Sequence, residues 1–219
     1  MTFTIQGIID NYVCIGWVKN VCSPKTKMFW KTISQGVVLL DPEVQLKALQ
    51  DAYLTVQEAK NAHKDIVVIS LKSWLADHIA TLAQKHQFHY LTHKLPSGFL
   101  TNFETLFATI QQMNEKRKFI ASENFVRLTK KEQSMMKRQL AKIEKIYEWV
   151  KNLTKKPDLV IVIDGGMVAD LMQEIWLTKT PSIVLASTDF PQWVAGTDTV
   201  IMNLHNQKAP IYVLDELFS

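Results

Sequence analysis

The sequence predicts an α/β protein, with a mostly parallel sheet covered by helices on both faces and an inserted antiparallel coiled-coil hairpin. The first observation behind this is the alternation of short β-branched runs with helical segments, which is typical of βαβ units. The second is the stretch at residues 99–156, which has no strand signal and carries apolar residues at heptad spacing.

The expected parallel strands are runs that stay apolar throughout, as in strands buried on both faces. They lie at residues 66–71, 88–91, 159–163, 182–186 and 199–202. Helices are expected between them, at about residues 41–62, 73–87 and 167–177. Asp41 is the expected N-cap of the first helix, since Pro42 and Glu43 follow it. This arrangement is flavodoxin- or Rossmann-like.

Residues 1–36 form no regular pattern and are expected to be an irregular N-terminal extension. Gly7, Gly16 and Pro24 interrupt this stretch. A short apolar run at residues 36–40 then indicates a strand.

The hairpin is predicted from two apolar series at steps of 4, 3, 4 and 3. They are Phe99, Phe103, Leu106, Ile110 and Met113, and then Met136, Leu140, Ile143, Tyr147 and Val150. Two capping boxes, Thr101 with Glu104 and Thr129 with Glu132, are expected to begin the two arms. We therefore divide the chain into an α/β domain of residues 1–98 and 157–219 and an inserted hairpin of residues 99–156.

Positive charge is concentrated in the same inserted stretch. The chain has a formal net charge of +4. From Phe103 to Lys156 there are 13 lysine or arginine residues against 6 acidic ones, so the rest of the chain sums to −3. A basic segment on a mildly acidic body indicates a polyanionic partner for that segment.

The basic residues of the hairpin follow both arms, as Lys116, Arg117, Lys118, Lys130, Lys131, Lys137, Arg138, Lys142, Lys145 and Lys151. Such a stripe binds phosphates with a salt-sensitive affinity that depends little on base sequence. The alternative is a solvated exterior that Glu144 and Glu148 compensate. A second group of lysines is interleaved with Trp17, Phe29 and Trp30, which suits either base stacking or packing into the core.

The segment Asp164-Gly165-Gly166 is where enzyme chemistry would be expected, because ligands of open α/β sheets bind at the carboxyl ends of strands. One interpretation makes Asp164 a Mg²⁺ ligand of a small hydrolase or phosphatase-like enzyme. The other makes it an N-cap, with the glycines forming the turn. The usual nucleotide-binding fingerprints are absent from the sequence, which favours the second interpretation.

No metal, cofactor or membrane partner is expected. Cys14 and Cys22 form no Cys-x-x-Cys pair, and the histidines follow no ligand spacing. No apolar run approaches the ~20 residues that a membrane span needs. Residues 1–9 carry no lysine or arginine, so they resemble neither a signal peptide nor a transit peptide.

Three segments resemble signatures of the small-subunit ribosomal protein S-two family. KLPSGFLTNF at residues 94–103 resembles Arg-Trp-Leu-Gly-Gly-x-Leu-Thr-Asn, with Lys94 in place of the arginine and a departure at residues 95–97. FVRLTKKE at residues 125–132 is similar to Phe-x-x-Leu-Thr-Lys-Lys-Glu and is the most specific match. PDLVIVID at residues 157–164 resembles Pro-Asp-x-x-x-Val-x-Asp.

Weaker matches extend this resemblance from Gly16 to Asn203 in one unbroken order. Glu174 and Pro181 stand at the family spacing, whereas residues 187–189 replace the usual Asp-Thr-Asn. The family's terminal helix and basic tail are reduced to residues 209–219. These eroded signatures favour a mitochondrial member, in the matrix, over one of the bacterial cytoplasm.

The resemblance implies a structural constituent of the small ribosomal subunit that lies between head and body and catalyses nothing. Its implied partners are small-subunit ribosomal RNA and neighbouring ribosomal proteins, with no small-molecule substrate. With the charge pattern, it predicts rRNA contacts by Lys19, Lys25, Lys27, Lys31, Lys94, Asn102, Lys116, Arg117, Lys118, Arg127, Lys130, Lys131, Lys137 and Arg138.

Overall fold

The computed structural model describes residues 3–147, 150, 153, 155–190 and 197–219. Its centre is a five-stranded sheet in which every neighbouring pair is parallel. The strands are β4 (Ile66–Ser70), β5 (His89–Leu91), β6 (Leu159–Ile163), β7 (Ser182–Ala186) and β8 (Thr197–Ile201). Their order, β5-β4-β6-β7-β8, is the flavodoxin-like order, with its switch point between β4 and β6.

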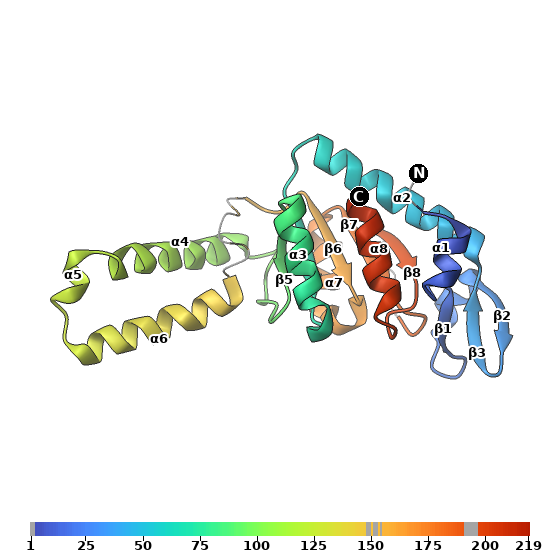
Figure 1. Cartoon of the computed structure of the whole chain (residues 1–219), viewed down its shortest axis with the longest axis horizontal. Helices are drawn as coiled ribbons and strands as arrows, with labels where there is room; N and C mark the ends of the chain where they lie inside the picture. Colours follow the sequence, from blue (N-terminus) through green and yellow to red (C-terminus); the bar gives the residue numbers. More distant parts are fainter. Residues whose placement is uncertain (1–2, 148–149, 151–152, 154, 191–196) are drawn as a thin grey trace.

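Helices cover both faces of this sheet, as the sequence predicts (Figure 1). The side chains of β6 alternate between two cores: Ile161 and Ile163 face one, and Val160 and Val162 face the other. The first core contains α2 (Pro42–Asn61), α3 (Ala76–His86) and α8 (Lys208–Phe218), and the second contains α7 (Ala169–Thr178).

Helices α2 and α8 of the body have well-defined ends. Asp41 caps α2, since its Oδ1 accepts a 3.0 Å hydrogen bond from the Glu43 N–H. At the other end of the chain, Phe218 stacks on Phe88 with 4.2 Å between ring centroids. Lys60 Nζ donates to the Phe218 carbonyl at 2.9 Å, which satisfies a free carbonyl at the end of α8. Residues 209–219 therefore complete the first core.

The prediction of an irregular extension at residues 1–36 is wrong for the described part of that segment. It contains α1 (Ile5–Asp10), β1 (Ile15–Val18), the 3₁₀ helix η1 (Pro24–Phe29) and β2 (Trp30–Ser34). With β3 (Val37–Leu40), the two strands form a separate antiparallel sheet in the order β1-β3-β2. This sheet lies beside α1 at one end of the molecule (Figure 1).

Of the three strands, β3 lies within the strand predicted at residues 36–40, whereas β1 and β2 were missed because they are short and lack alternation. β2 has no fully buried residue, and β1 has only Gly16. The turn between β2 and β3 is made by Gln35 and Gly36, whose φ angles of +49° and +80° are those of a two-residue hairpin turn. Asn-Gly or Asp-Gly usually marks such a turn, so Gln-Gly gives a weak signal.

The insert is an antiparallel pair of helices that projects from the body (Figure 1). It consists of α4 (Phe103–Ile120), the short α5 (Glu123–Val126) and α6 (Lys130–Tyr147). The base of α4 packs into the second core through Leu106 and Ile110, as do Val150 and Leu153 on the return path. Supercoiling of the pair and the domain bounds at residues 99 and 156 stay predictions.

Candidate nucleic-acid interface

The second arm of the hairpin begins with the predicted capping box. The Thr129 hydroxyl and N–H donate to Glu132 Oε2 at 2.8 and 2.9 Å, and the Glu132 N–H donates back to Thr129 Oγ1 at 3.4 Å. The two hydrogen bonds from Thr129 lower the pKa of the Glu132 carboxyl. Gln133 Nε2 donates to the carbonyls of Phe125 and Leu128 at 3.1 and 3.0 Å, which ties the tip to α6.

The inward side of the hairpin is apolar. Ile110 and Met113 of α4 and Leu140 of α6 are buried, in agreement with the heptad spacing. At the edge of this seam, Arg117 Nε of α4 donates to Glu144 Oε1 of α6 at 3.0 Å. This ion pair joins the two arms and orients the guanidinium of Arg117 toward the partner arm.

All the charged residues on the outward side of α6 are basic. At about 100° per residue, six cations fall within an arc of roughly 140° centred opposite the seam. All six are exposed, and Glu132 and Glu144 lie outside this arc. We call this surface the basic face of α6; it consists of Lys130, Lys131, Lys137, Arg138, Lys142 and Lys145.

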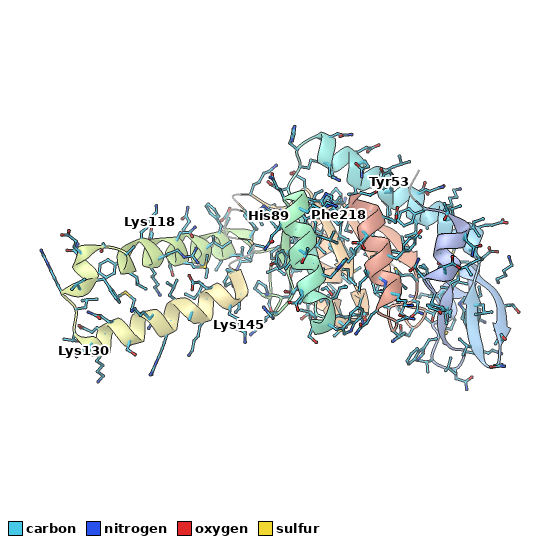
Figure 2. All side chains as sticks on the ribbon, viewed as in Figure 1. Tyr53, His89, Lys118, Lys130, Lys145 and Phe218 are labelled. Atoms are coloured by element: carbon cyan, nitrogen blue, oxygen red, sulfur yellow. The ribbon has the colours of Figure 1, made fainter. Side chains whose placement is uncertain are left out.

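The basic face runs along the length of α6. Figure 2 shows Lys130 and Lys145 toward its two ends and Lys118 on α4. With a rise of 1.5 Å per residue, the face extends over about 22 Å. Lys142 and Lys145 complete it but are not among the predicted rRNA contacts, although helical periodicity places them there. Lys151 of the predicted stripe and Glu148, the other acid offered as a compensating charge, lie outside the described residues.

The remaining predicted residues of the hairpin lie at its tip. Lys116 and Lys118 are in the last turns of α4, with Lys116 partly buried and Lys118 exposed. Arg127 follows α5 and is exposed beside Val126, whose side chain is 77% exposed. Lys137 Nζ lies 5.4 Å from the centre of the Phe125 ring, so it also contacts the tip.

The N-terminal lysines form a second basic patch, with Lys19, Lys25, Lys27 and Lys31 all exposed. Lys31 Nζ is 3.9 Å from Asp41 Oδ1, so part of its charge is compensated. This patch lies on the small sheet and η1, at the end of the molecule opposite the hairpin (Figure 1). The structure thus places the predicted RNA-binding residues of the N-terminal segment and those of the hairpin on two distant surfaces.

The aromatic residues of the N-terminal patch are engaged in packing. Phe29 belongs to the second core and is 8% exposed. The Trp17 ring stacks on His205 with 3.8 Å between centroids, and Trp30 Nε1 donates to Thr26 Oγ1 at 3.2 Å. These contacts support the packing interpretation over base stacking.

Lys94 and Asn102 flank the junction between body and hairpin, and both are exposed. Asn102 is the N-cap position of α4, and its Oδ1 accepts a 2.7 Å hydrogen bond from the Thr105 hydroxyl. The capping box predicted for Thr101 and Glu104 is wrong. The Thr101 N–H and hydroxyl instead donate to Glu174 of α7.

Asp164 occupies the predicted N-cap position, before the 3₁₀ helix η4 (Gly165–Val168), but it does not act as a side-chain cap. Its φ of +66° is left-handed and its side chain makes no cap hydrogen bond. Asp164 Oδ2 instead lies 2.8 Å from Lys72 Nζ, and both side chains are largely buried. Because Lys72 follows β4 and Asp164 follows β6, the ion pair occupies the switch point where flavodoxin-like folds bind ligands. This geometry disfavours a Mg²⁺ role for Asp164.

Within the part of the chain that the structure describes, no group of three or more histidine, cysteine or acidic side chains could hold a metal ion. Over the same residues, none of the helices has both the length and the apolar character needed to cross a bilayer.

Comparison with known proteins places these features in a family. The family model described as Ribosomal protein S2 matches residues 8–209. The chain therefore belongs to the ribosomal protein S2 family, as the three signature segments indicated. Members of this family are structural and not enzymes, which excludes the hydrolase alternative.

Curated relatives agree with the family match. The chain is 28% identical over 186 residues to the small ribosomal subunit protein uS2 of Picosynechococcus, covering 85% of this chain and 73% of the relative. It is 28% identical over 189 residues to the uS2 protein of Amoebophilus asiaticus, covering 86% and 60%. For the uS2 protein of Petrotoga mobilis the identity is 26% over 167 residues, covering 76% and 58%. At these identities, the chain is a divergent member.

Proposed function

We propose that this protein is a structural component of the small ribosomal subunit that binds ribosomal RNA through the basic face of α6. The observation that carries the proposal is the segregation of six exposed cations on one side of that helix, with both described acids of α6 outside it. A surface of this kind releases counterions from an RNA backbone without reading base sequence.

The N-terminal patch supports a second RNA contact at the far end of the molecule. Its lysines lie on the small sheet and η1, where the aromatic residues are already packed, so we expect phosphate contacts there and no base stacking. The body between the two patches is neutral to acidic and suits packing against neighbouring ribosomal proteins. Two separated RNA contacts would let the protein bridge different parts of the subunit, in agreement with a position between head and body.

The proposal is tested by reversing charge on the basic face. We expect Lys130→Glu, Lys131→Glu, Lys137→Glu and Arg138→Glu together to abolish co-sedimentation with small subunits in a reconstitution assay. The matched control reverses four exposed lysines elsewhere, Lys47, Lys64, Lys85 and Lys179, and changes net charge by the same amount. Unchanged incorporation of the first variant, or equal loss by both, would show that the basic face has no specific role.

The salt dependence of binding gives a second readout. If four contacts to phosphates of duplex RNA are removed, the slope of log K against log salt concentration should become less negative by about 3.6. The control should leave the slope unchanged, which separates local phosphate contacts from a general change in net charge.

The compartment is the finer part of the proposal. We propose a mitochondrial ribosome because the family signatures at residues 95–97 and 187–189 are eroded. The relatives reported above are bacterial. Fractionation of the native cell tests the compartment. Recovery in the cytoplasmic ribosome fraction alone would reject the mitochondrial assignment.

A further inference from the structure

The junction between body and hairpin contains a carboxylate whose neighbours are mainly backbone amides. Glu174 of α7 is only 8% exposed. Its Oε1 accepts from the Gly98 N–H at 2.8 Å, and its Oε2 accepts from the N–H groups of Leu100 and Thr101 at 2.7 and 3.2 Å. The Thr101 hydroxyl adds a fourth hydrogen bond at 3.4 Å.

Among the described residues, the buried carboxylate of Glu174 is surrounded by backbone N–H groups and not by a cationic side chain. Among the residues that the structure describes, Glu174 takes part in no ion pair. Burying a carboxylate is costly unless donors replace its hydration, and here three backbone N–H groups converge on it. Gly98 makes the convergence possible, because its φ of +76° turns the backbone in a way that other residues rarely adopt.

The clamped segment is the one from which the hairpin leaves the body. Residues 98–101 directly precede Asn102 and the first turn of α4. Phe99 and Leu100 in this segment are fully buried, but apolar packing is non-directional. Hydrogen bonds to a carboxylate fix both position and direction of the backbone. We propose that Glu174 is a positioning residue that sets the direction in which the hairpin projects.

A small change in the direction of the backbone at this junction produces a larger displacement at the tip of the hairpin. The 18 residues of α4 span about 27 Å, so a tilt of about 10° at the base moves the tip by roughly 5 Å. A shift of that size removes a phosphate from the reach of a lysine. The benefit to RNA binding rests on the proposed function, whereas the positioning itself is a property of the free protein.

The experiment measures hairpin direction in the isolated full-length protein. Spin labels are attached at Glu123→Cys in α5 and Lys47→Cys in α2, in a chain with Cys14→Ala and Cys22→Ala, and the distance distribution is recorded by electron spin resonance. The isosteric Glu174→Gln replaces a charged acceptor with a group that also donates. The control is Asp170→Asn, which removes an exposed carboxylate from the same helix.

We expect Glu174→Gln to widen the distance distribution and Asp170→Asn to leave it unchanged. Residue-resolved hydrogen exchange of the amides of 98, 100 and 101 should accelerate by about tenfold or more, while β4 and β6 stay protected. A merely structural role would weaken protection throughout the body without widening the distribution. Gly98→Ala should reproduce the widening, because its Cβ would lie 3.0 Å from Asn102 Cβ at a strained φ.

An unchanged distribution in Glu174→Gln would overturn the inference. If that variant fails to fold, Gly98→Ala decides by the same measurement. Because no ribosome is present, failure here leaves the RNA role of the basic face intact, and failure of the charge-reversal test leaves this result intact.

Discussion

Lys72 and Asp164 follow neighbouring parallel strands and neutralise each other at the edge of the sheet. Their Nζ and Oδ2 atoms are 2.8 Å apart, and their side chains are 12% and 19% exposed. In related α/β folds this edge is open to nucleotides or metal ions. Here the protein's own ion pair occupies it, which is consistent with a structural role.

The Lys72–Asp164 pair is expected to stabilise the body by acting as a unit. Asp164→Asn and Lys72→Met should each lower the free energy of unfolding by about 1–3 kcal/mol, since each leaves a largely buried charge unpaired. The double variant should cost less than the sum of the two, and urea unfolding measures all three. Strict additivity would show that the two charges do not interact. Asparagine tolerates the positive φ of position 164, so backbone strain is not added.

Cys14 is expected to be an unreactive thiol. Burial, and then the nearby charge of Asp41, raise the pKa of Cys14 to about 11, with a smaller opposing effect from Lys31. In a Cys22→Ala chain at pH 8, Cys14 should react with a disulfide reagent about a hundredfold more slowly than in urea, because only the thiolate attacks.

The same pKa change of Cys14 gives a direction for the pH dependence of stability. The unfolded thiol titrates near 9.0 and the folded thiol near 11, so the unfolded chain loses its proton first. The stabilising contribution is complete below pH 9 and declines as the pH rises toward 11. A reaction profile of the folded protein with its midpoint near pH 9 would contradict this account.

Single residues were predicted well where only neighbours in sequence decide their contacts. Asp41 and the Thr129–Glu132 box behave as expected because their partners are two or three residues away. Thr101 and Asp164 have equally good local patterns, but Glu174 and Lys72 compete for them from distant segments. A sequence pattern does not reveal such tertiary competitors.

At the scale of elements, the hairpin depends on a narrow seam. Leu140 is the one residue of α6 in the described part that is buried, at 8% exposure, and it faces the apolar side of α4. The rest of α6 is exposed or partly buried, and much of it is charged. The pairing of α4 and α6 therefore depends on a small buried apolar surface.

Leu140→Ala is expected to weaken the hairpin without unfolding the body. Loss of the buried side chain should destabilise the pairing of α4 and α6 by about 2–4 kcal/mol. Hydrogen exchange should accelerate in α4 and α6, while β4 and β6 keep their protection. Gln139→Ala, at an exposed position of the same turn, should have no such effect. Equal loss of protection in sheet and hairpin would show that the two unfold together.

Elements were predictable where burial gives a clear pattern. The parallel strands lie within about two residues of expectation, because β4, β6 and β7 are buried at every position and are β-branched. In the small N-terminal sheet only β3 was predicted, because β2 has no buried position and the turn that joins it to β3 uses Gln-Gly. Short edge strands whose faces are exposed to solvent show no alternation of apolar and polar residues in the sequence.

At the scale of the whole molecule, charge is arranged at two ends of an elongated protein. The basic face of α6 lies on the hairpin, and the N-terminal lysines lie on the small sheet at the other end (Figures 1 and 2). The sequence located both basic groups but not their separation, because that depends on how the sheet and hairpin attach to the body. Because the two basic surfaces are far apart, we propose that they make two independent contacts with RNA.

The sedimentation of the native protein tests most directly whether it is part of the small ribosomal subunit. A clarified lysate of the source cell is separated on a sucrose gradient and probed for this chain, with and without enough Mg²⁺ to hold the subunits together. We expect the protein to sediment with whole ribosomes in high Mg²⁺ and with the small-subunit peak when the subunits separate. Recovery at the top of both gradients, with free proteins, would contradict it.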